Sequence, residues 1–176
     1  SDTAVAMAAT DGTIETNLTT IKTEDADIAI TVTGTEGTVA QLATIAGATT
    51  GTVVFSCGLS DTAVAMSAAN GTIEGDLTTI KTEDGDIAIT VTGDAGKVAQ
   101  LATIAGATTG TVVFSCGLSD TAVAMSATDG TIEANLTTIK TEDGDIAITV
   151  TGDAGTVSQL ATIAGATTGT VVFSCG

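Results

Sequence analysis

The sequence predicts an α/β repeat array, a right-handed solenoid-like stack whose copies each run strand–helix–strand–strand–helix. Three observations lead to this prediction. The heptapeptide Ser-Asp-Thr-Ala-Val-Ala-Met begins at residues 1, 60 and 119 of the 176, which sets a period of 59 residues. Copies two and three differ at only six positions, among them Lys97 against Thr156. Short segments with helical spacing alternate with β-branched runs. Near-identical copies at a fixed period are typical of stacked arrays.

The period divides the chain into repeat 1 over 1–59, repeat 2 over 60–118 and repeat 3 over 119–176, with Leu59 and Leu118 as joints. Stacked arrays usually end in atypical, polar capping repeats. Here Ser1 opens one copy and Gly176 closes another. We therefore expect either a slice of a longer array or a subunit that stacks end to end.

Two short helices are predicted in each copy. In copy three, the residues that share a helical face are Ile132, Leu136 and Ile139 in the first segment and Val157, Leu160 and Ala164 in the second. Both segments are short, so tertiary packing must hold them. Gly144 and Gly169 follow them as expected helix stops or turn residues.

Three strands are predicted around these helices. Ile-Ala-Ile-Thr-Val (146–150) alternates with a period of two, and Thr-Val-Val-Phe-Ser (170–174) is a β-branched run. Thr-Ala-Val-Ala-Met (121–125) is the predicted third strand, because Val123 and Met125 align with Ile148 and Val150 when the half-copies are superposed. The segment Cys-Gly-Leu-Ser-Asp supplies the turn before it. Strand–helix–strand links within one sheet are almost always right-handed.

Charge excludes several classes of partner. The chain carries 4 basic and 21 acidic residues, a net charge of −17. Nothing in such a chain neutralises phosphates, so we expect no nucleic-acid partner. No apolar run approaches the ~20 residues needed to cross a bilayer, so we expect no membrane insertion. An acidic surface of this kind suits solvation, cations or a salty medium.

The sequence does not favour an enzyme. It has no histidine, which rules out Ser-His and Cys-His nucleophile pairs. Its carboxylates recur three times on equivalent surfaces, whereas an active site demands one specific geometry. We therefore predict no catalytic residues and no certain cofactor.

Acidic residues gather after the first helix of every copy and form candidate Ca²⁺ sites. These are Glu24, Asp25 and Asp27, then Glu83, Asp84 and Asp86, then Glu142, Asp143 and Asp145. Ca²⁺ takes six to eight oxygen ligands, which clustered carboxylates at a turn can supply. A solvated acidic turn explains the same pattern, and no EF-hand motif is present. Repulsion among these charges predicts some dependence on salt or divalent ions.

One cysteine recurs in each copy, at Cys57, Cys116 and Cys175. Equivalent atoms of neighbouring copies in a solenoid lie roughly 9–10 Å apart, and a disulfide needs Cα atoms within about 7 Å. Bridges between neighbouring copies are therefore not expected. Two interpretations stay open, a packed thiol following the apolar Thr-Val-Val-Phe-Ser or an inter-chain cross-link from the turn. Three thiols cannot all pair internally.

The segment Val-Thr-Gly-Thr-Glu-Gly-Thr-Val-Ala-Gln-Leu-Ala-Thr-Ile-Ala-Gly-Ala-Thr-Thr-Gly-Thr-Val-Val-Phe-Ser (32–56) resembles tandem repeats of very large bacterial, cyanobacterial-type, cell-surface proteins. The shared pattern is Thr-Gly-Thr, a helix with Leu-x-x-Ile, and Ala-Thr-x-Gly-Thr-Val. It covers about half of each copy. The resemblance implies an extracellular or cell-surface location and a structural or adhesive role. We therefore expect a structural repeat protein of an extracellular bacterial surface layer or filament that self-associates, and as the alternative a calcium-stiffened adhesin or ligand-binding module.

Overall fold

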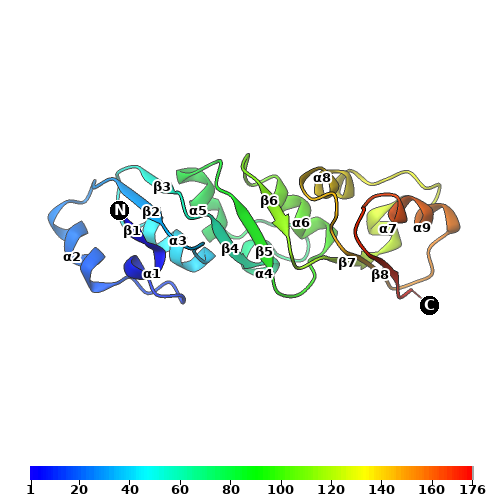
Figure 1. Ribbon diagram of the computed structural model, residues 1–176, viewed down its shortest axis with the longest axis horizontal. Helices are drawn as coiled ribbons and strands as arrows, with labels where there is room; N and C mark the ends of the chain where they lie inside the picture. The colour runs from blue at the N-terminus through cyan, green and yellow to red at the C-terminus, as the bar shows by residue number, and fades with distance from the viewer. Residues whose placement is uncertain (176) are drawn as a thin grey trace. The chain divides into compact units, whose positions relative to one another are not determined.

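A computed structural model describes residues 1–175, and each copy of the sequence forms a small parallel sheet with helices (Figure 1). The strand orders are β1-β2-β3, β4-β5-β6 and β7-β8-β9, each following the order along the chain. The strands are β1 (Asp2–Thr3), β2 (Ile30–Thr33), β3 (Val53–Phe55), β4 (Leu59–Thr62), β5 (Ile89–Thr92), β6 (Val112–Phe114), β7 (Leu118–Thr121), β8 (Ile148–Thr151) and β9 (Val171–Phe173). The α/β class and the three similar units of about 59 residues are thus confirmed.

Three kinds of helix recur once per copy. The one-turn helices are α1 (Ala4–Met7), α4 (Ala63–Met66) and α7 (Ala122–Met125). The nine-residue helices are α2 (Thr16–Glu24), α5 (Gly75–Glu83) and α8 (Ala134–Glu142), and the eight-residue helices are α3 (Val39–Ala46), α6 (Val98–Ala105) and α9 (Val157–Ala164). Within residues 1–175, no helix has the length and apolar character that spanning a bilayer requires.

Strand register places the large apolar side chains on one face of each sheet. In the first sheet Ile30 pairs with Val53 and Val32 with Phe55, and all four are buried. Alternating side chains point to opposite faces of a strand, so Thr31 and its partner Val54 lie on the other face and are more exposed. The alternation seen in the sequence therefore separates residues that face the core from residues that face the solvent.

A buried glutamine fixes the start of each eight-residue helix. Thr38 precedes α3, and its hydroxyl accepts a hydrogen bond from the Gln41 amide at 3.2 Å, while Gln41 Oε1 accepts from the Thr38 amide at 3.1 Å. This reciprocal capping box satisfies two backbone donors that a helix N-terminus leaves unpaired. The side-chain nitrogen Nε2 of Gln41 donates to the carbonyl of Ala8 at 2.8 Å. The same side chain thus caps α3 and ties it to the chain after α1.

The predicted strand over 121–125 is wrong. Residues Ala122–Met125 form α7, and the strand is β7, in which Leu118 and Asp120 pair with Ile148 and Val150. The Thr121 hydroxyl accepts from the Ala124 amide at 3.3 Å and caps the short helix. Burial follows helical spacing, because Ala122 and Met125 are buried while Val123 is 65% exposed. Each copy therefore contains one helix more than the sequence predicts.

Two further details differ from expectation. Ile132 lies before α8, in an antiparallel bridge with Ser126, so it is not part of that helix face. Gly165, not Gly169, caps the end of α9. Gly169 lies in a bend where a Cβ atom would meet the carbonyl of Asp145. Gly144 directly follows Asp143, which caps the end of α8, as the sequence predicted.

The chain divides into two compact units that do not follow the 59-residue period. The first contains Ser1–Asp61, Glu74–Thr90 and Ala107–Thr111, and the second contains Thr62–Ile73, Val91–Gly106 and the chain from Val112 onward. The first unit therefore contains a junction between copies one and two. The second contains the corresponding junction between copies two and three.

Candidate functional site

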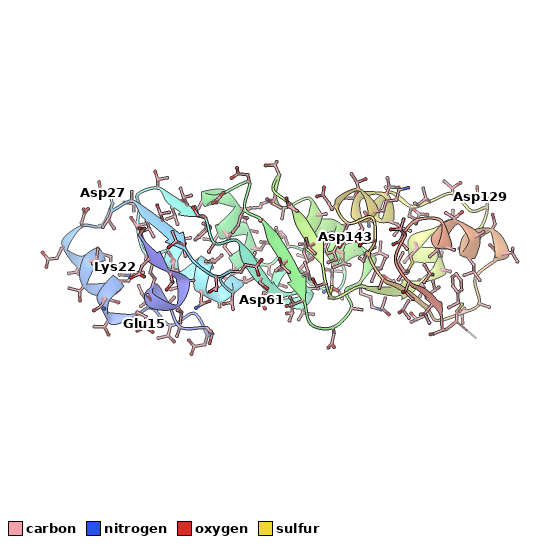
Figure 2. All side chains as sticks on the ribbon, in the orientation of Figure 1. Glu15, Lys22, Asp27, Asp61, Asp129 and Asp143 are labelled. Carbon is pink, nitrogen blue, oxygen red and sulfur yellow. The ribbon has the colours of Figure 1, made fainter. Side chains whose placement is uncertain are left out.

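Two backbone amides donate to carboxylates of the following copy at each junction. In the first unit, Val39 N donates to Asp61 Oδ2 at 3.1 Å and Phe55 N to Asp84 Oδ2 at 2.8 Å. In the second unit, Val98 N donates to Asp120 Oδ2 at 3.1 Å and Phe114 N to Asp143 Oδ2 at 2.8 Å. Figure 2 labels Asp61 and Asp143 among the side chains. The same pair of bonds therefore recurs one period apart.

Both donors are amides that regular secondary structure leaves without a partner. Val39 is the first residue of α3, where backbone N–H groups have no intrahelical acceptor. A carboxylate there also benefits from the positive end of the helix dipole. Phe55 lies in β3, an edge strand of its sheet, where one row of amides is unpaired. Asp61 and Asp84 thus supply acceptors for two backbone amides of the preceding copy, one in α3 and one in β3.

Apolar packing accompanies these hydrogen bonds. In the first unit α3 packs against α5, and in the second α6 packs against α8. Leu77 and Ile80 of α5 are fully buried, as are Leu136 and Ile139 of α8. Complete burial of a side chain of this size contributes roughly 1.5–3 kcal/mol. Each junction is therefore an apolar helix pair flanked by two charge-assisted hydrogen bonds.

A third set of bonds joins the ends of copies through the backbone. In the first unit Ser60 N donates to the Gly37 carbonyl at 2.9 Å, and Gly37 N donates to the Gly58 carbonyl at 3.1 Å. Ser119, Gly96 and Gly117 repeat these contacts in the second unit. A Cβ at Gly37 would approach Leu42 Cδ2 within 2.6 Å. The glycine therefore allows this close approach.

The structure places the predicted calcium ligands of copies two and three at these junctions and those of copy one on the open side of that copy, and it brings each set together only in part. Asp84 and Asp86 interact with each other, as do Asp143 with Asp145 and Asp25 with Asp27. The remaining members, Glu24, Glu83 and Glu142, end their helices as exposed residues. Within residues 1–175, no three acidic or cysteine side chains gather closely enough to hold a metal ion. Calcium binding stays a prediction.

Two of the junction carboxylates, Asp84 and Asp143, have raised pKa values. Burial raises the pKa of Asp84 above its ordinary value of 3.8, and the hydrogen bond and negative charge of Asp86 act in the same direction. The Phe55 amide opposes this effect. The pKa of Asp143 is raised by the same causes, with Asp145 in the place of Asp86. Asp25 is fully exposed, and its pKa is raised mainly by the hydrogen bond with Asp27. Burial at the junction is what distinguishes the internal pairs.

The three cysteines are free thiols. Cys57 is buried and its thiol donates to the Gly58 carbonyl at 3.2 Å, and Cys116 makes the same contact with Gly117. Burial raises the pKa of both thiols. Cys175 is half-buried. The packed environment of Cys57 and Cys116 favours the first interpretation at these positions, and the cross-link stays a prediction.

Sequence reasoning missed the residues that organise the junction and the interior of the copies. Gln41, Gln100 and Gln159 are buried, and the Thr-x-x-Gln pattern at 38–41 is a signal that could have identified the first of them. The roles of Asp61 and Asp120 had no such signal, because their donors lie 22 residues earlier in the chain.

Comparison with protein-family models, with curated proteins and with solved structures finds no match to this chain.

Proposed function

We propose that this chain is a structural repeat protein of an extracellular bacterial surface layer or filament, built by stacking near-identical copies. One observation carries the proposal: the same two carboxylate–amide bonds and the same helix pair join successive copies at both junctions. A junction that repeats with the sequence period can add copies without changing its contacts. Nearest-neighbour interfaces of this kind are what repeat arrays rely on for stability.

The composition supports the same proposal. A net charge of −17 keeps the surface solvated and repels unrelated acidic surfaces. The resemblance of 32–56 to repeats of bacterial surface proteins gives the expected location.

Electron microscopy of labelled cells tests the proposal. Antibodies raised against the purified chain should bind intact cells of the organism that makes it, and gold particles should follow a continuous layer or filaments. Permeabilised cells are the control for internal antigen. Labelling that requires permeabilisation, or that is scattered with no layer or filament beneath it, would contradict the proposed role.

A further inference from the structure

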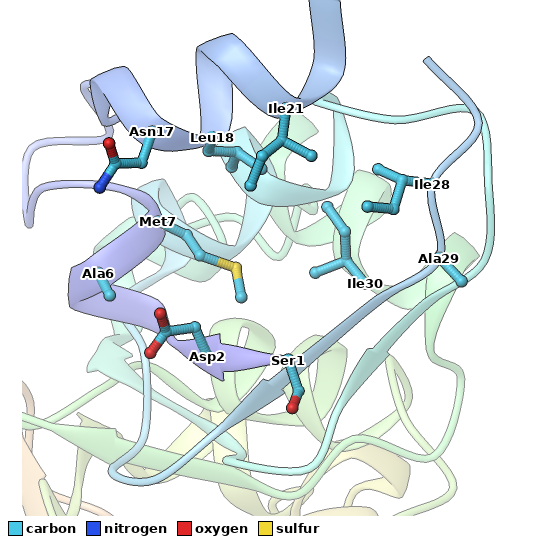
Figure 3. Close-up of a pocket in the computed structure, with 10 residues that line it drawn as sticks. All are labelled: Ser1, Asp2, Ala6, Met7, Asn17, Leu18, Ile21, Ile28, Ala29 and Ile30. Carbon is cyan, nitrogen blue, oxygen red and sulfur yellow. The ribbon is translucent and has the colours of Figure 1, made fainter. Parts of the chain in front are cut away.

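The first copy leaves open the apolar surface that the junctions cover elsewhere. We call this the N-face; it contains Leu18, Ile21 and Ile28 beside a hollow of about 210 Å³ (Figure 3). Ile21 is 45% exposed, whereas its counterparts Ile80 and Ile139 are 0% exposed. The difference arises because α5 and α8 pack against an eight-residue helix of the preceding copy. The N-face is therefore half of a junction.

The third copy leaves open the opposite half. We call this the C-face; it contains Val157, Ala164 and Phe173. Val157 is 85% exposed, against 3% for Val39 and 2% for Val98. Phe173 is 44% exposed, against 3% for both Phe55 and Phe114. The helix sequences of α3 and α9 differ only at Ala40 against Ser158. The C-face thus presents nearly the same side chains that cover α5 in the first unit.

Hydrogen-bonding groups on the two faces are complementary as well. Asp2 and Asp25 are the counterparts of Asp61 and Asp84, and both are exposed. Within residues 1–175, no amide of an eight-residue helix or of a Val-Val-Phe strand donates to either of them. Val157 and Phe173 are the counterparts of the donors Val39 and Phe55. Each face therefore has the partner groups that the other lacks.

We propose that the C-face of one chain docks on the N-face of a second copy of this chain and reproduces the internal junction, so that chains join head to tail. This inference rests on the proposed structural function and identifies its interface. It assigns two intermolecular bonds, from Val157 N to Asp2 and from Phe173 N to Asp25 of the second copy. Such a contact is heterologous, so each chain that docks presents a new open face to the next chain.

Other exposed apolar residues do not belong to this interface. Val5, Val64 and Val123 are 63%, 70% and 65% exposed, nearly the same in all three copies. Copy one lacks a preceding copy, copy three lacks a following one and copy two has both, yet the exposure of this valine is nearly the same in all three. No junction covers these valines, and they provide a matched control.

The test uses two variants that each block one face. Val157→Glu places a charge on the C-face, and Ile21→Glu places one on the N-face; Val123→Glu is the control with equal charge. Sedimentation is measured over rising protein concentration at about 1 M NaCl, where the Debye length of about 3 Å screens repulsion between acidic chains. Circular dichroism confirms folding. Asp2→Lys, which opposes the dipole of the incoming helix, replaces Ile21→Glu if that variant unfolds.

Wild type and Val123→Glu should form polymers that grow with concentration, whereas each face variant alone should stay monomeric. An equimolar mixture of Val157→Glu and Ile21→Glu should stop at two chains, because only one open face of each kind remains. A monomeric wild type, polymers of either face variant, or a mixture that stays monomeric would overturn the proposal. Cell labelling is an independent measurement. Surface filaments without pairing in the mixture would reject this interface and leave the proposed function standing. Pairing in the mixture without surface labelling would support the interface and reject the proposed function.

Discussion

The backbone amide of Phe114 donates to Oδ2 of Asp143 at 2.8 Å, and this bond links copy two to copy three within the second unit. Phe55 and Asp84 make the identical contact one period earlier at 2.8 Å. An edge-strand amide that loses its acceptor in a half-buried site must remain unsatisfied or recruit water. The contact therefore contributes to stability through both partners.

Removing this acceptor should destabilise the fold. We expect Asp143→Ala to lower the free energy of unfolding by about 1–2 kcal/mol, measured by urea denaturation. Asp143→Asn keeps an acceptor oxygen and removes the repulsion from Asp145, so it should be at least as stable as wild type. Asp25→Ala is the matched control at protein concentrations too low for chains to join, since within one chain no phenylalanine amide is seen to donate to Asp25 among residues 1–175. Equal losses for Asp25→Ala and Asp143→Ala would contradict the role of the junction bond.

Stability should increase as the pH falls from 7 toward 4. The pKa values of Asp84 and Asp143 are raised in the folded state, chiefly by burial. Between the unfolded pKa of 3.8 and the higher folded pKa, the folded state binds more protons than the unfolded state. The free energy of unfolding is therefore greatest below 3.8 and falls as the pH rises through the folded pKa. Asp11 and Asp129, whose pKa values are lowered by the amides of Thr13 and Thr131, begin to oppose this only near 3.8 and below.

Two double variants separate the paired carboxylates from net charge. Asp86→Asn with Asp145→Asn removes the neighbours that help raise the two pKa values, so the pH dependence of urea denaturation should flatten. Asp94→Asn with Asp153→Asn removes the same number of charges from exposed positions. If this second pair flattens the profile equally, general charge repulsion and not the junction pairs controls the effect.

Much of the fold is readable from the sequence because its apolar spacing is unambiguous. The α9 helix, Val157–Ala164, contains the three residues that were predicted to share a helical face, and β8 (Ile148–Thr151) overlaps the predicted alternating run over 146–150 at residues 148–150. The segment 122–125 was ambiguous. Val123 and Met125 fit a strand, while Ala122 and Met125 fit one helical turn. Tertiary packing decides between them, because Ala122 and Met125 are buried while Val123 is exposed, and α1 forms the same turn although the Thr3 side chain makes no cap.

The junction could not be predicted in the same way. Asp84 looks like part of an acidic turn, and its role depends on an amide 29 residues earlier that tertiary packing brings to it. The buried Gln41 reaches a carbonyl 33 residues away. Short-range sequence spacing cannot reveal contacts between residues that lie 29 or 33 positions apart. The 59-residue period, in contrast, indicated that any contact of one copy would be repeated in the others.

Two glycines in copy one should respond oppositely to alanine. A Cβ at Gly51 would meet the carbonyls of Asp27 and Ile28, which are backbone atoms that cannot turn aside. Gly51→Ala should therefore lower the free energy of unfolding by about 1–3 kcal/mol. Gly47 caps α3 at φ −75°, and a Cβ there would lie 3.5 Å from its nearest neighbouring atom, so alanine fits this helical conformation. Gly47→Ala should raise stability by about 0.4–1 kcal/mol. Urea denaturation measures both, and a neutral Gly51→Ala would contradict the close approach.

The cysteines should react with iodoacetamide in the order of their exposure. The thiolate is the nucleophile, and burial raises the pKa of Cys57 and Cys116 above their ordinary 9.0. At about pH 8 the native chain should therefore be alkylated first at Cys175 and last at Cys57, which mass spectrometry of peptides can follow. All three should react alike in about 6 M guanidinium chloride. Native labelling of Cys57 as fast as Cys175 would contradict its buried position.

The same burial determines where a cross-link between chains can form. A disulfide requires that the thiol reach solvent and a second sulfur, so Cys57, whose thiol donates to Gly58, must first leave its packed site. Cys175 is half-buried, two residues beyond Phe173 of the open C-face, and needs no such opening. Under oxidising conditions we expect any disulfide-linked dimer to join Cys175 residues, and Cys175→Ser should abolish it while Cys57→Ser should not. Non-reducing mass spectrometry measures the linkage. A dimer that persists in Cys175→Ser and disappears in Cys57→Ser would show that the buried thiol is the one that opens.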